Sequence, residues 1–226
     1  MKRVVTRELL DEDAGTPDEI ANSLLDLHSF NQKLGGFSSM SDLLYRVARK
    51  SDRQSLTLLD VAGGTGDVAD QAARSCSTKG ITVHGTVLDR AASHMRNHDS
   101  RIFNLAGDAL ALPLRARSFD VVGCNLFCHH LEPEEMVKFF NDALQVARLA
   151  VIVSDLRRNV FHWLAAHVGA PIYRSRITRN DAPASVRRAY TIAEISDIAC
   201  LTSATSFEVC PYFFQRFGLI LWKADS

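Results

Sequence analysis

A glycine-rich turn joins an apolar run to a helical pattern, and this junction constrains the fold of the chain more than any other feature. The apolar run, residues 56–61, ends in Asp60-Val61, the turn spans residues 62–66, and small apolar residues at helical spacing follow Asp67. Glycines let the backbone approach a ligand closely, and the first residues of a helix leave N–H groups free. The order strand, tight turn, helix predicts a site for a nucleotide-like ligand in a doubly wound sheet.

The glycine spacing disfavours dinucleotides and nucleoside triphosphates as that ligand. One residue separates Gly64 from Gly66, and no glycine follows at the third position of a dinucleotide-binding motif. The Lys-Ser/Thr pair of a P-loop is also missing after the turn. Asp67 stands at the helix start, where its charge suits the helix dipole but repels a phosphate. We therefore expect a nucleoside without phosphates that carries a cationic or zwitterionic group. An NAD-dependent oxidoreductase is disfavoured on the same grounds.

The rest of the chain alternates between strands and helices, which indicates an α/β doubly wound fold. Near-continuous apolar runs fit strands that are buried on both faces of a parallel sheet. The last two runs are joined by too few residues for a helical crossover, so they are expected to pair as an antiparallel hairpin. The predicted strands cover residues 56–61, 81–88, 101–105, 119–125, 150–154, 206–209 and 216–222. Short or full helices are predicted after Arg90, after Pro133, over 159–173 and over 191–201.

The N-terminal region is predicted to be mostly helical. Thr16-Pro-Asp-Glu19 reads as a capping box with proline at the first helical position. A second helix is expected after Phe37-Ser-Ser, before the first strand. We therefore divide the chain into an N-terminal helical cap, residues 1–50, and a ligand-binding domain, residues 51–226, with an insertion that covers the substrate at about 157–190.

Charge and cysteine content exclude several broad classes. The 26 basic and 26 acidic residues cancel, which gives no support for nucleic acid or an anionic membrane as the main partner. The five scattered cysteines lack a Cys-x-x-Cys pair and read as reduced thiols rather than disulfides or a metal site. No apolar run reaches the length of a membrane span, and the early acidic residues are unlike a signal peptide. A cytoplasmic protein without a metal is expected, and the oligomeric state stays open.

Acidic residues follow the second and third predicted strands, where doubly wound sheets hold their ligands. Asp89, followed by Arg90, is placed to accept hydrogen bonds from a ribose diol, or to cap the next helix. Asp108 follows Gly107 and is either a second ligand contact or a turn residue.

The glycine turn resembles the first motif of the class I S-adenosylmethionine-dependent methyltransferases, which reads acid-x-Gly-x-Gly-x-Gly. Asp60, Ala62, Gly64 and Gly66 fall on its four positions, and Ala62 departs from it by one methyl group, with Gly63 beside it to relax the loop. The resemblance covers residues 55–154 well and the final hairpin loosely. It implies a seven-stranded Rossmann-like sheet and S-adenosylmethionine as cofactor.

The same resemblance implies roles for residues farther along the chain. The Asp108 carboxylate and the Ala109 N–H are placed at the adenine ring, and backbone carbonyls near Asn125 face the methionine ammonium. Phe127 lies near the adenosine, or is simply a core residue. Asp60, the turn residues 62–66, Asp89 and Arg90 complete the predicted cofactor site.

Two histidines after the fourth strand are the candidate catalytic residues. His129 or His130 offers a neutral imidazole that can take a proton from an acceptor hydroxyl near pH 7, although one of them can instead bond a loop carbonyl. Asp155, after the fifth strand, is expected to orient a substrate hydroxyl or a histidine, or to cap a helix. The arginines of residues 173–181, Arg174, Arg176 and Arg179, suggest an anionic acceptor, with a solvated loop as the equal alternative.

More widely, the sequence looks like bacterial small-molecule methyltransferases that are associated with polyketide synthase genes. This likeness rests on the Leu-Leu-Asp-Glu-Asp start, the His-His segment and the Arg-x-Thr-Arg-x-Asp and Ser-Val-Arg-Arg-Ala-Tyr stretches. It implies methyl transfer to a small aromatic or polyketide-like acceptor, at a hydroxyl oxygen. A C-methyltransferase of the quinone-biosynthesis type and a catalytically silent S-adenosylmethionine-binding protein remain the alternatives.

Overall fold

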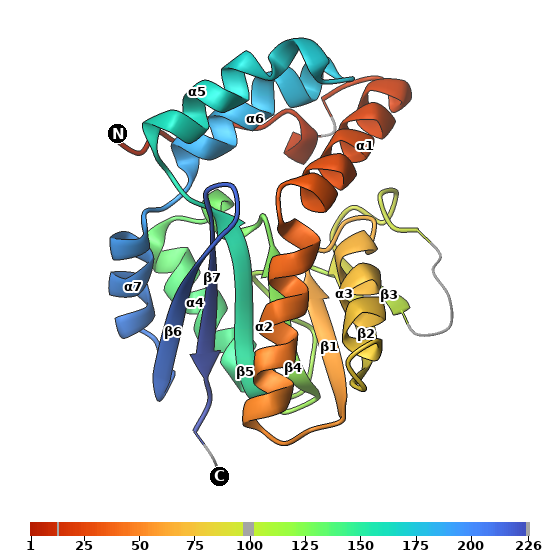
Figure 1. The fold of residues 1–226 in the computed structure, drawn as a ribbon, viewed down its shortest axis with the longest axis vertical. Helices are drawn as coiled ribbons and strands as arrows, with labels where there is room; N and C mark the ends of the chain where they lie inside the picture. Colours follow the sequence, from red (N-terminus) through yellow and green to blue (C-terminus); the bar gives the residue numbers. More distant parts are fainter. Residues whose placement is uncertain (13, 97–101, 225–226) are drawn as a thin grey trace.

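The computed structural model describes residues 1–12, 14–96 and 102–224. Seven strands form one sheet of order β3-β2-β1-β4-β5-β7-β6, in which β7 runs antiparallel to both β5 and β6 (Figure 1). The strands are β1 Ser55–Val61, β2 Thr82–Asp89, β3 Ile102–Ala106, β4 Phe119–Asn125, β5 Ala147–Leu156, β6 Ser206–Tyr212 and β7 Arg216–Trp222. The doubly wound, mostly parallel sheet with an antiparallel C-terminal hairpin is thus confirmed.

Helices cover both faces of the sheet and one of its ends. The α-helices are α1 Pro17–Lys33, α2 Gly36–Lys50, α3 Asp67–Ser77, α4 Pro133–Val146, α5 Val160–Val168, α6 Arg176–Arg188 and α7 Ile192–Cys200. Short 3-10 turns span η1 Leu10–Glu12, η2 Cys128–His130 and η3 Ala170–Ile172. Helices α2 and α3 pack on one face, while α4 and α7 pack on the other (Figure 1). The described residues include no helix with the length and apolarity that a membrane crossing needs.

The central strands are apolar because they are buried from both sides. Leu58 points its side chain into the core shared with α2 and α3, whereas the next residue, Leu59, lies in the core shared with α4 and α7. This alternation follows from the two-residue period of a strand, and it explains why β1 reads as a continuous apolar run. Burial of Leu58 and Leu59 fixes the register that brings Asp60 to the carboxyl end of β1.

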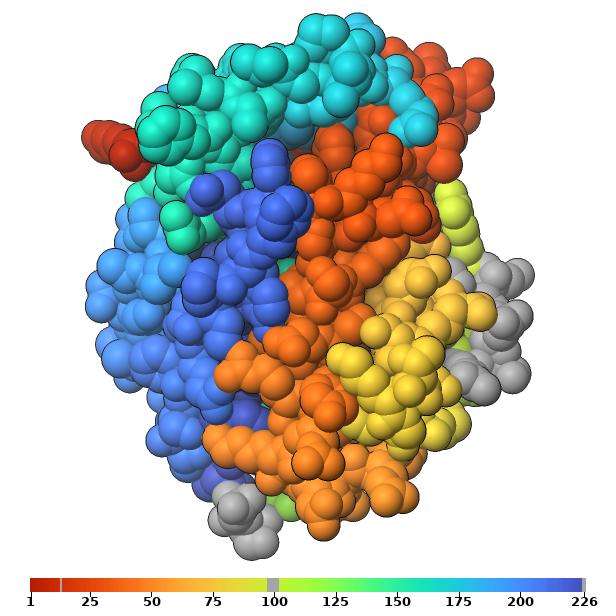
Figure 2. All heavy atoms as spheres, viewed as in Figure 1, coloured from red at the N-terminus to blue at the C-terminus, as the bar shows by residue number. Residues whose placement is uncertain are grey.

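A helical layer, consisting of α1, α5 and α6, lies across the carboxyl ends of the strands. Figure 2 shows α5 and the N-terminal part of the chain crossing the end of the molecule above the sheet and its flanking helices. The capping box of α1 is present, with Thr16 accepting from the Glu19 N–H. Helix α2 packs on the sheet instead of joining this layer. The division at residue 50 and the boundaries of the insertion remain predictions.

Two local expectations were wrong. After Arg90 the described residues, up to 96, form only turns, because Asp89 accepts the Ala91 N–H and so stabilises a turn. The helix expected over 159–173 ends at Val168, where Gly169 and the following Ala-Pro break it into α5 and η3. The arginine-rich stretch forms α6 despite the internal Pro183. Residue 101, expected to begin the third strand, lies outside the described residues.

The carboxylate of Asp26 fastens α6 to α1. Asp26 is buried, and its Oδ2 accepts hydrogen bonds from the backbone N–H groups of Arg174 at 2.9 Å and Ser175 at 3.2 Å. The Arg174 guanidinium donates to the other oxygen at 3.1 Å. Buried N–H groups left without an acceptor cost free energy, so Asp26 fixes where α6 begins over the sheet.

We expect the Asp26→Ala substitution to lower the free energy of unfolding by about 2 kcal/mol, because the N–H of the buried Ser175 and the N–H of Arg174 lose their acceptor. Urea denaturation measures the change. Asp197→Ala, at an exposed position of α7, is the control and is expected to change stability by less than about 0.5 kcal/mol. Equal effects of the two substitutions would show that Asp26 does not fasten the helical layer.

Candidate functional site

A cavity of about 1240 Å³ lies between the carboxyl ends of the strands and the helical layer. Its walls come from the glycine turn, the ends of β2 and β4, η2, helices α1, α5 and α6, and the N-terminal segment. Cavities that bury one drug-sized ligand span roughly 300–1,000 Å³. This one is therefore large enough to hold a nucleoside and a second small molecule together.

The glycine turn adopts left-handed backbone conformations at three positions. Ala62, Gly64 and Gly66 have φ of 54°, 53° and 78°, so the alanine at the first motif position accepts a conformation that glycine adopts more readily. A Cβ on Gly64 would meet nothing within 4 Å, whereas a Cβ on Gly63 would meet an Asp60 oxygen at 2.8 Å. The backbone at Gly64 thus borders open cavity space, and Gly63 packs tightly on the end of β1.

Asp60 is a buried carboxylate with no hydrogen-bond partner in the described part of the chain. The residue is 1% exposed, and neither carboxylate oxygen accepts a hydrogen bond there. Burial, with a smaller contribution from the negative charge of Asp89, raises the pKa of Asp60 to about 7. A native protein that keeps such a group unsatisfied needs an explanation, and its place on the cavity wall suggests a cationic ligand.

Asp89 and Asp108 also line the cavity, at the ends of β2 and β3. Asp89 accepts from the N–H groups of Gly64 and Ala91, at 2.8 and 2.9 Å. It therefore ties the glycine turn to β2, and each of its oxygens still has capacity for a further hydrogen bond. Asp108 accepts from the Leu110 N–H at 2.9 Å, which is the turn role, and no backbone donor from the described residues reaches its other oxygen.

The remaining predicted cofactor residues fall on the same side. Ala62, Gly63, Gly64, Arg90, Ala109, Asn125 and Phe127 all line the cavity, while Gly66 is the N-cap of α3 behind the turn. Phe127 packs edge-on against Phe139 with ring centroids 5.3 Å apart, so it belongs both to the cavity wall and to the core. The Arg90 guanidinium donates to the Asp11 carbonyl at 2.6 Å, which joins this wall to the N-terminal segment.

A buried arginine forms the floor beside Asn125. Arg216 is 2% exposed and donates to Asn125 Oδ1 at 3.1 Å and to Asn31 Oδ1 at 3.0 Å. Burial lowers the pKa of Arg216 to about 10. The sequence analysis noted Arg216 only as the start of a strand, because nothing local distinguishes it from a surface arginine.

His129 is held by Asp155 beneath the helical layer. His129 is 3% exposed, its ring Nδ1 is 2.7 Å from Asp155 Oδ1, and its backbone N–H donates to Asp155 Oδ2 at 3.1 Å. Burial acts to raise the pKa of Asp155, but the charge of His129 and these hydrogen bonds leave it below the usual value. A carboxylate that accepts at Nδ1 places the proton of a neutral imidazole there, so the lone pair of Nε2 faces the cavity.

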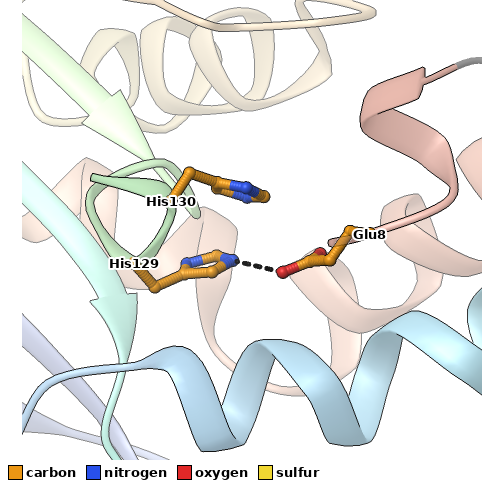
Figure 3. A group of neighbouring side chains, drawn as sticks. All are labelled: Glu8, His129 and His130. Carbon is orange, nitrogen blue, oxygen red and sulfur yellow. Dashed lines mark ion pairs between the residues drawn. The ribbon is translucent and has the colours of Figure 1, made fainter. Parts of the chain in front are cut away.

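Glu8 faces His129 from the N-terminal segment (Figure 3). Its Oε1 is 3.7 Å from His129 Nε2, and its Oε2 accepts from the Ser185 hydroxyl at 2.7 Å. Burial raises the pKa of Glu8 to about 7, although the nearby His130 and the Ser185 hydrogen bond act to lower it. The ring of His130 lies over that of His129, with centroids 4.1 Å apart, and its Nδ1 is 2.8 Å from Asp11 Oδ2.

Asp155 was assigned to the substrate site, but it is not among the residues that line the cavity. It is 1% exposed, and its carboxylate contacts His129 and the Leu156 N–H, which fits the histidine-orienting alternative. Of the three arginines assigned to the substrate, Arg174 lines the cavity, whereas Arg176 and Arg179 do not. They turn away because Arg176 pairs with Glu19 at 2.5 Å and Arg179 donates to the Tyr173 carbonyl at 3.1 Å.

Glu8 is the site residue that the sequence analysis missed. It reaches the cavity because Asp181 of α6 accepts the N–H groups of Leu9 and Leu10, at 2.9 and 3.0 Å. These contacts join residues more than 170 positions apart, so no local sequence pattern predicts them. The acidic start of the chain was the only signal, and acidic starts are common.

Comparison with known proteins agrees with this architecture. Residues 58–149 match the family model described as a methyltransferase domain. A ubiquinone/menaquinone biosynthesis C-methyltransferase UbiE of Methylobacterium nodulans is 37% identical over 122 residues, which cover 49% of this chain and 47% of the relative. The chain thus spans about half the length of the curated relative that it matches.

Solved structures share the fold over nearly the whole chain. The plantazolicin methyltransferase BpumL, in complex with a triazolic desmethylPZN analog and SAH, aligns with a TM-score of 0.68 and 10% identity over 96% of this chain and 94% of its own. The methyltransferase SibL aligns with a TM-score of 0.64 and 16% identity over 98% of this chain and 64% of its own.

The ionisation of Asp60 predicts a pH dependence of stability. Because the folded pKa is raised above the value near 3.8 expected when unfolded, the carboxyl group favours the folded state at low pH, and this contribution is lost as the pH rises through about 7. We expect Asp60→Asn to reduce the loss of unfolding free energy between pH 5 and pH 8, by an amount on the order of 2 kcal/mol or more.

Urea denaturation of both proteins at the two pH values tests this expectation. Parallel pH profiles for the wild type and Asp60→Asn would contradict the picture of a buried carboxylate without a partner.

Proposed function

We propose that the chain, whose residues 58–149 match a methyltransferase domain, is a class I S-adenosylmethionine-dependent methyltransferase that transfers the methyl group to a small, largely apolar acceptor at a hydroxyl oxygen. The single observation that carries this proposal is Asp60, a buried and unpartnered carboxylate on the cavity wall beside an open glycine turn. A carboxylate in that setting favours a ligand with a positive charge and no phosphate.

The residues of the cofactor wall fit S-adenosylmethionine. Asp60 and the turn at Gly64 would border the methionine part, and Asp89 has free acceptor capacity for the ribose hydroxyls. Asp108 and the Ala109 N–H would read the adenine. When bound, S-adenosylmethionine supplies an electrophilic methyl group on a positively charged sulfur.

The opposite part of the cavity suits a flat or apolar acceptor. Phe30 and Tyr173, from α1 and the segment after η3, meet edge to face with centroids 5.3 Å apart on the cavity wall. Leu24 and Leu27 of α1 and Ile172 add further apolar lining. Aromatic side chains of this kind supply contact area for aromatic ligands. The chain thereby excludes water and aligns the acceptor, which is the main contribution a protein makes to a direct displacement.

The polar end of this acceptor region is the group Glu8, His129 and His130. Asp155 fixes the orientation of the His129 ring, so that Nε2 is available towards the cavity. The acceptor's nucleophilic atom is proposed to lie at this end, where the chain offers a lone pair and a carboxylate. The prediction that a histidine acts as the general base stays a prediction.

Transfer to carbon is the second candidate, and the sequence likeness to UbiE favours it. Incubation with methyl-labelled S-adenosylmethionine and panels of phenols, polyketide-type enols and quinols distinguishes the two. Mass spectrometry detects the transferred label, and NMR of the product separates an O-methyl from a C-methyl group. Transfer to phenols or enols at oxygen supports the proposal, while label only on the carbon of quinols replaces it with the alternative.

We expect Asp89→Ala to weaken S-adenosylmethionine binding at least about tenfold, because hydrogen bonds to a charged group contribute about 1.5–3 kcal/mol. Asp155→Ala, the matched control, is expected to change this affinity less than threefold, since Asp155 contacts His129 rather than the cofactor wall. Isothermal titration calorimetry gives both values. Equal losses of affinity would contradict the assignment of the cofactor wall.

A further inference from the structure

Three side chains on the acceptor side converge on one point without a direct hydrogen bond to one another in the described part of the chain. One oxygen of Glu8 and one ring nitrogen each of His129 and His130 all lie within 4.8 Å of one another. Figure 3 shows the two imidazole rings and the carboxylate facing the same space, from η2 and from the N-terminal segment. Glu8 and His129 are 7% and 3% exposed, so this space is largely shielded from solvent.

The contact between Glu8 and His129 is too long for a direct hydrogen bond. Glu8 Oε1 and His129 Nε2 are 3.7 Å apart, and Oε1 accepts no hydrogen bond in the described part of the chain. A buried carboxylate and imidazolium in direct contact would stand about 2.7–2.9 Å apart. A carboxylate that is more than nine-tenths buried and aimed at an imidazole lone pair, yet separated from it, indicates that something belongs between them.

The spacing suits a metal ion. With bonds of about 2.1 Å to nitrogen and oxygen, two ligands of a tetrahedral zinc ion are roughly 3.4 Å apart. The 3.7 Å separation of Glu8 and His129 exceeds that value by only a few tenths of an ångström. Small side-chain rotations, including that of His130, would bring the three atoms into place.

The groups around the three ligands have the arrangement expected of an outer shell. Metal-bound histidines commonly donate their second N–H to a carboxylate. Nδ1 of His129 is 2.7 Å from Asp155, and Nδ1 of His130 is 2.8 Å from Asp11. Each carboxylate fixes a tautomer that leaves Nε2 with its lone pair, which is the form a metal requires.

The local charge also favours a divalent cation. Three carboxylates, Glu8, Asp11 and Asp155, stand at the two histidines. Two arginines contact this group in the described part of the chain: Arg188 donates to the His130 carbonyl at 2.5 Å, and Arg90 donates to the Asp11 carbonyl at 2.6 Å. With neutral histidines and ionised carboxylates, the three acids and two arginines carry a net charge of about −1, so the surroundings favour a positive ion.

We propose that Glu8, His129 and His130 bind a divalent transition-metal ion, with zinc the best match to two imidazoles and one carboxylate. Three protein ligands leave a fourth position open, as in catalytic rather than structural zinc sites. That position faces the cavity and would take an oxygen of the acceptor. This last clause alone rests on the proposed methyl transfer, because the ion is bound whether or not an acceptor is present. The expectation of a protein without a metal rested on the cysteine pattern, which bears only on thiolate sites and not on a site made of Glu8 and two histidines.

Zinc binding by the tag-free chain tests the proposal directly. Isothermal titration with Zn²⁺ is expected to show one equivalent bound with a micromolar or lower Kd, and Co²⁺ should give the visible absorption of a low-symmetry site. Glu8→Gln preserves the size of the side chain and its hydrogen bond with Ser185, and is expected to weaken Zn²⁺ binding at least tenfold. Asp155→Asn, which alters only the outer shell, should weaken it about 10–100-fold.

Glu12→Gln is the matched control, since Glu12 lies on the same segment but is paired with Arg7 at the surface. It should leave the Zn²⁺ affinity unchanged. Thermal unfolding provides a second readout: Zn²⁺ should raise the Tm of the wild type and of Glu12→Gln, but not that of Glu8→Gln.

No binding up to 100 µM Zn²⁺, or equal binding by the wild type and Glu8→Gln, would overturn the metal site. Titration with S-adenosylmethionine in the absence of metal is independent of this result, so failure of the metal site and failure of the proposed methyl transfer can be told apart.

Discussion

The burial of an unpaired carboxylate at the end of β1 is the constraint on which the site depends. Asp60 is placed there because Leu58 and Leu59 hold β1 between two apolar layers. Its buried carboxylate has no hydrogen-bond partner in the described part of the chain, and the residue belongs to the cavity wall. A fold that only needed stability would gain from an apolar side chain at this position. A cationic ligand that pairs with Asp60 would offset the free-energy cost of burying its carboxylate. The open backbone at Gly64 and the carboxylates of Asp89 and Asp108 belong to the same wall.

The helical layer covers the cavity that this wall borders. Asp26 and Asp181 both use buried or half-buried carboxylates to bind backbone N–H groups, one to fix the start of α6 and the other to fix the N-terminal segment. As a result, Glu8 reaches His129 from the far end of the chain. Two different interactions thus build the two sides of the cavity. Strand burial sets the side proposed for the methyl donor, and long-range polar contacts set the side proposed for the acceptor.

The sequence predicted the first of these sides far better than the second. Strand burial and the glycine turn are local patterns, so the sheet, its C-terminal hairpin and the place of Asp60, Asp89 and Asp108 could be read directly. The prediction of a short helix after Arg90 was wrong because Asp89 stabilises a turn there. Helix α6 was not predicted because its sequence, with Pro183 and many arginines, lacks a clear helical pattern, and tertiary contacts stabilise it. Glu8 and Arg216 could not be recognised, since their importance comes entirely from partners distant in the sequence.

The central claim is that a positively charged ligand supplies the partner that the buried Asp60 carboxylate lacks. It is tested most directly by measuring the number of protons released when S-adenosylmethionine binds. Calorimetric titrations at pH 6.5 in buffers of different ionisation enthalpy give this number. A cation that settles beside Asp60 lowers a pKa of about 7, so binding should release a substantial fraction of a proton, and Asp60→Asn should release none. Binding without proton release, or equal release by the wild type and Asp60→Asn, would contradict the account.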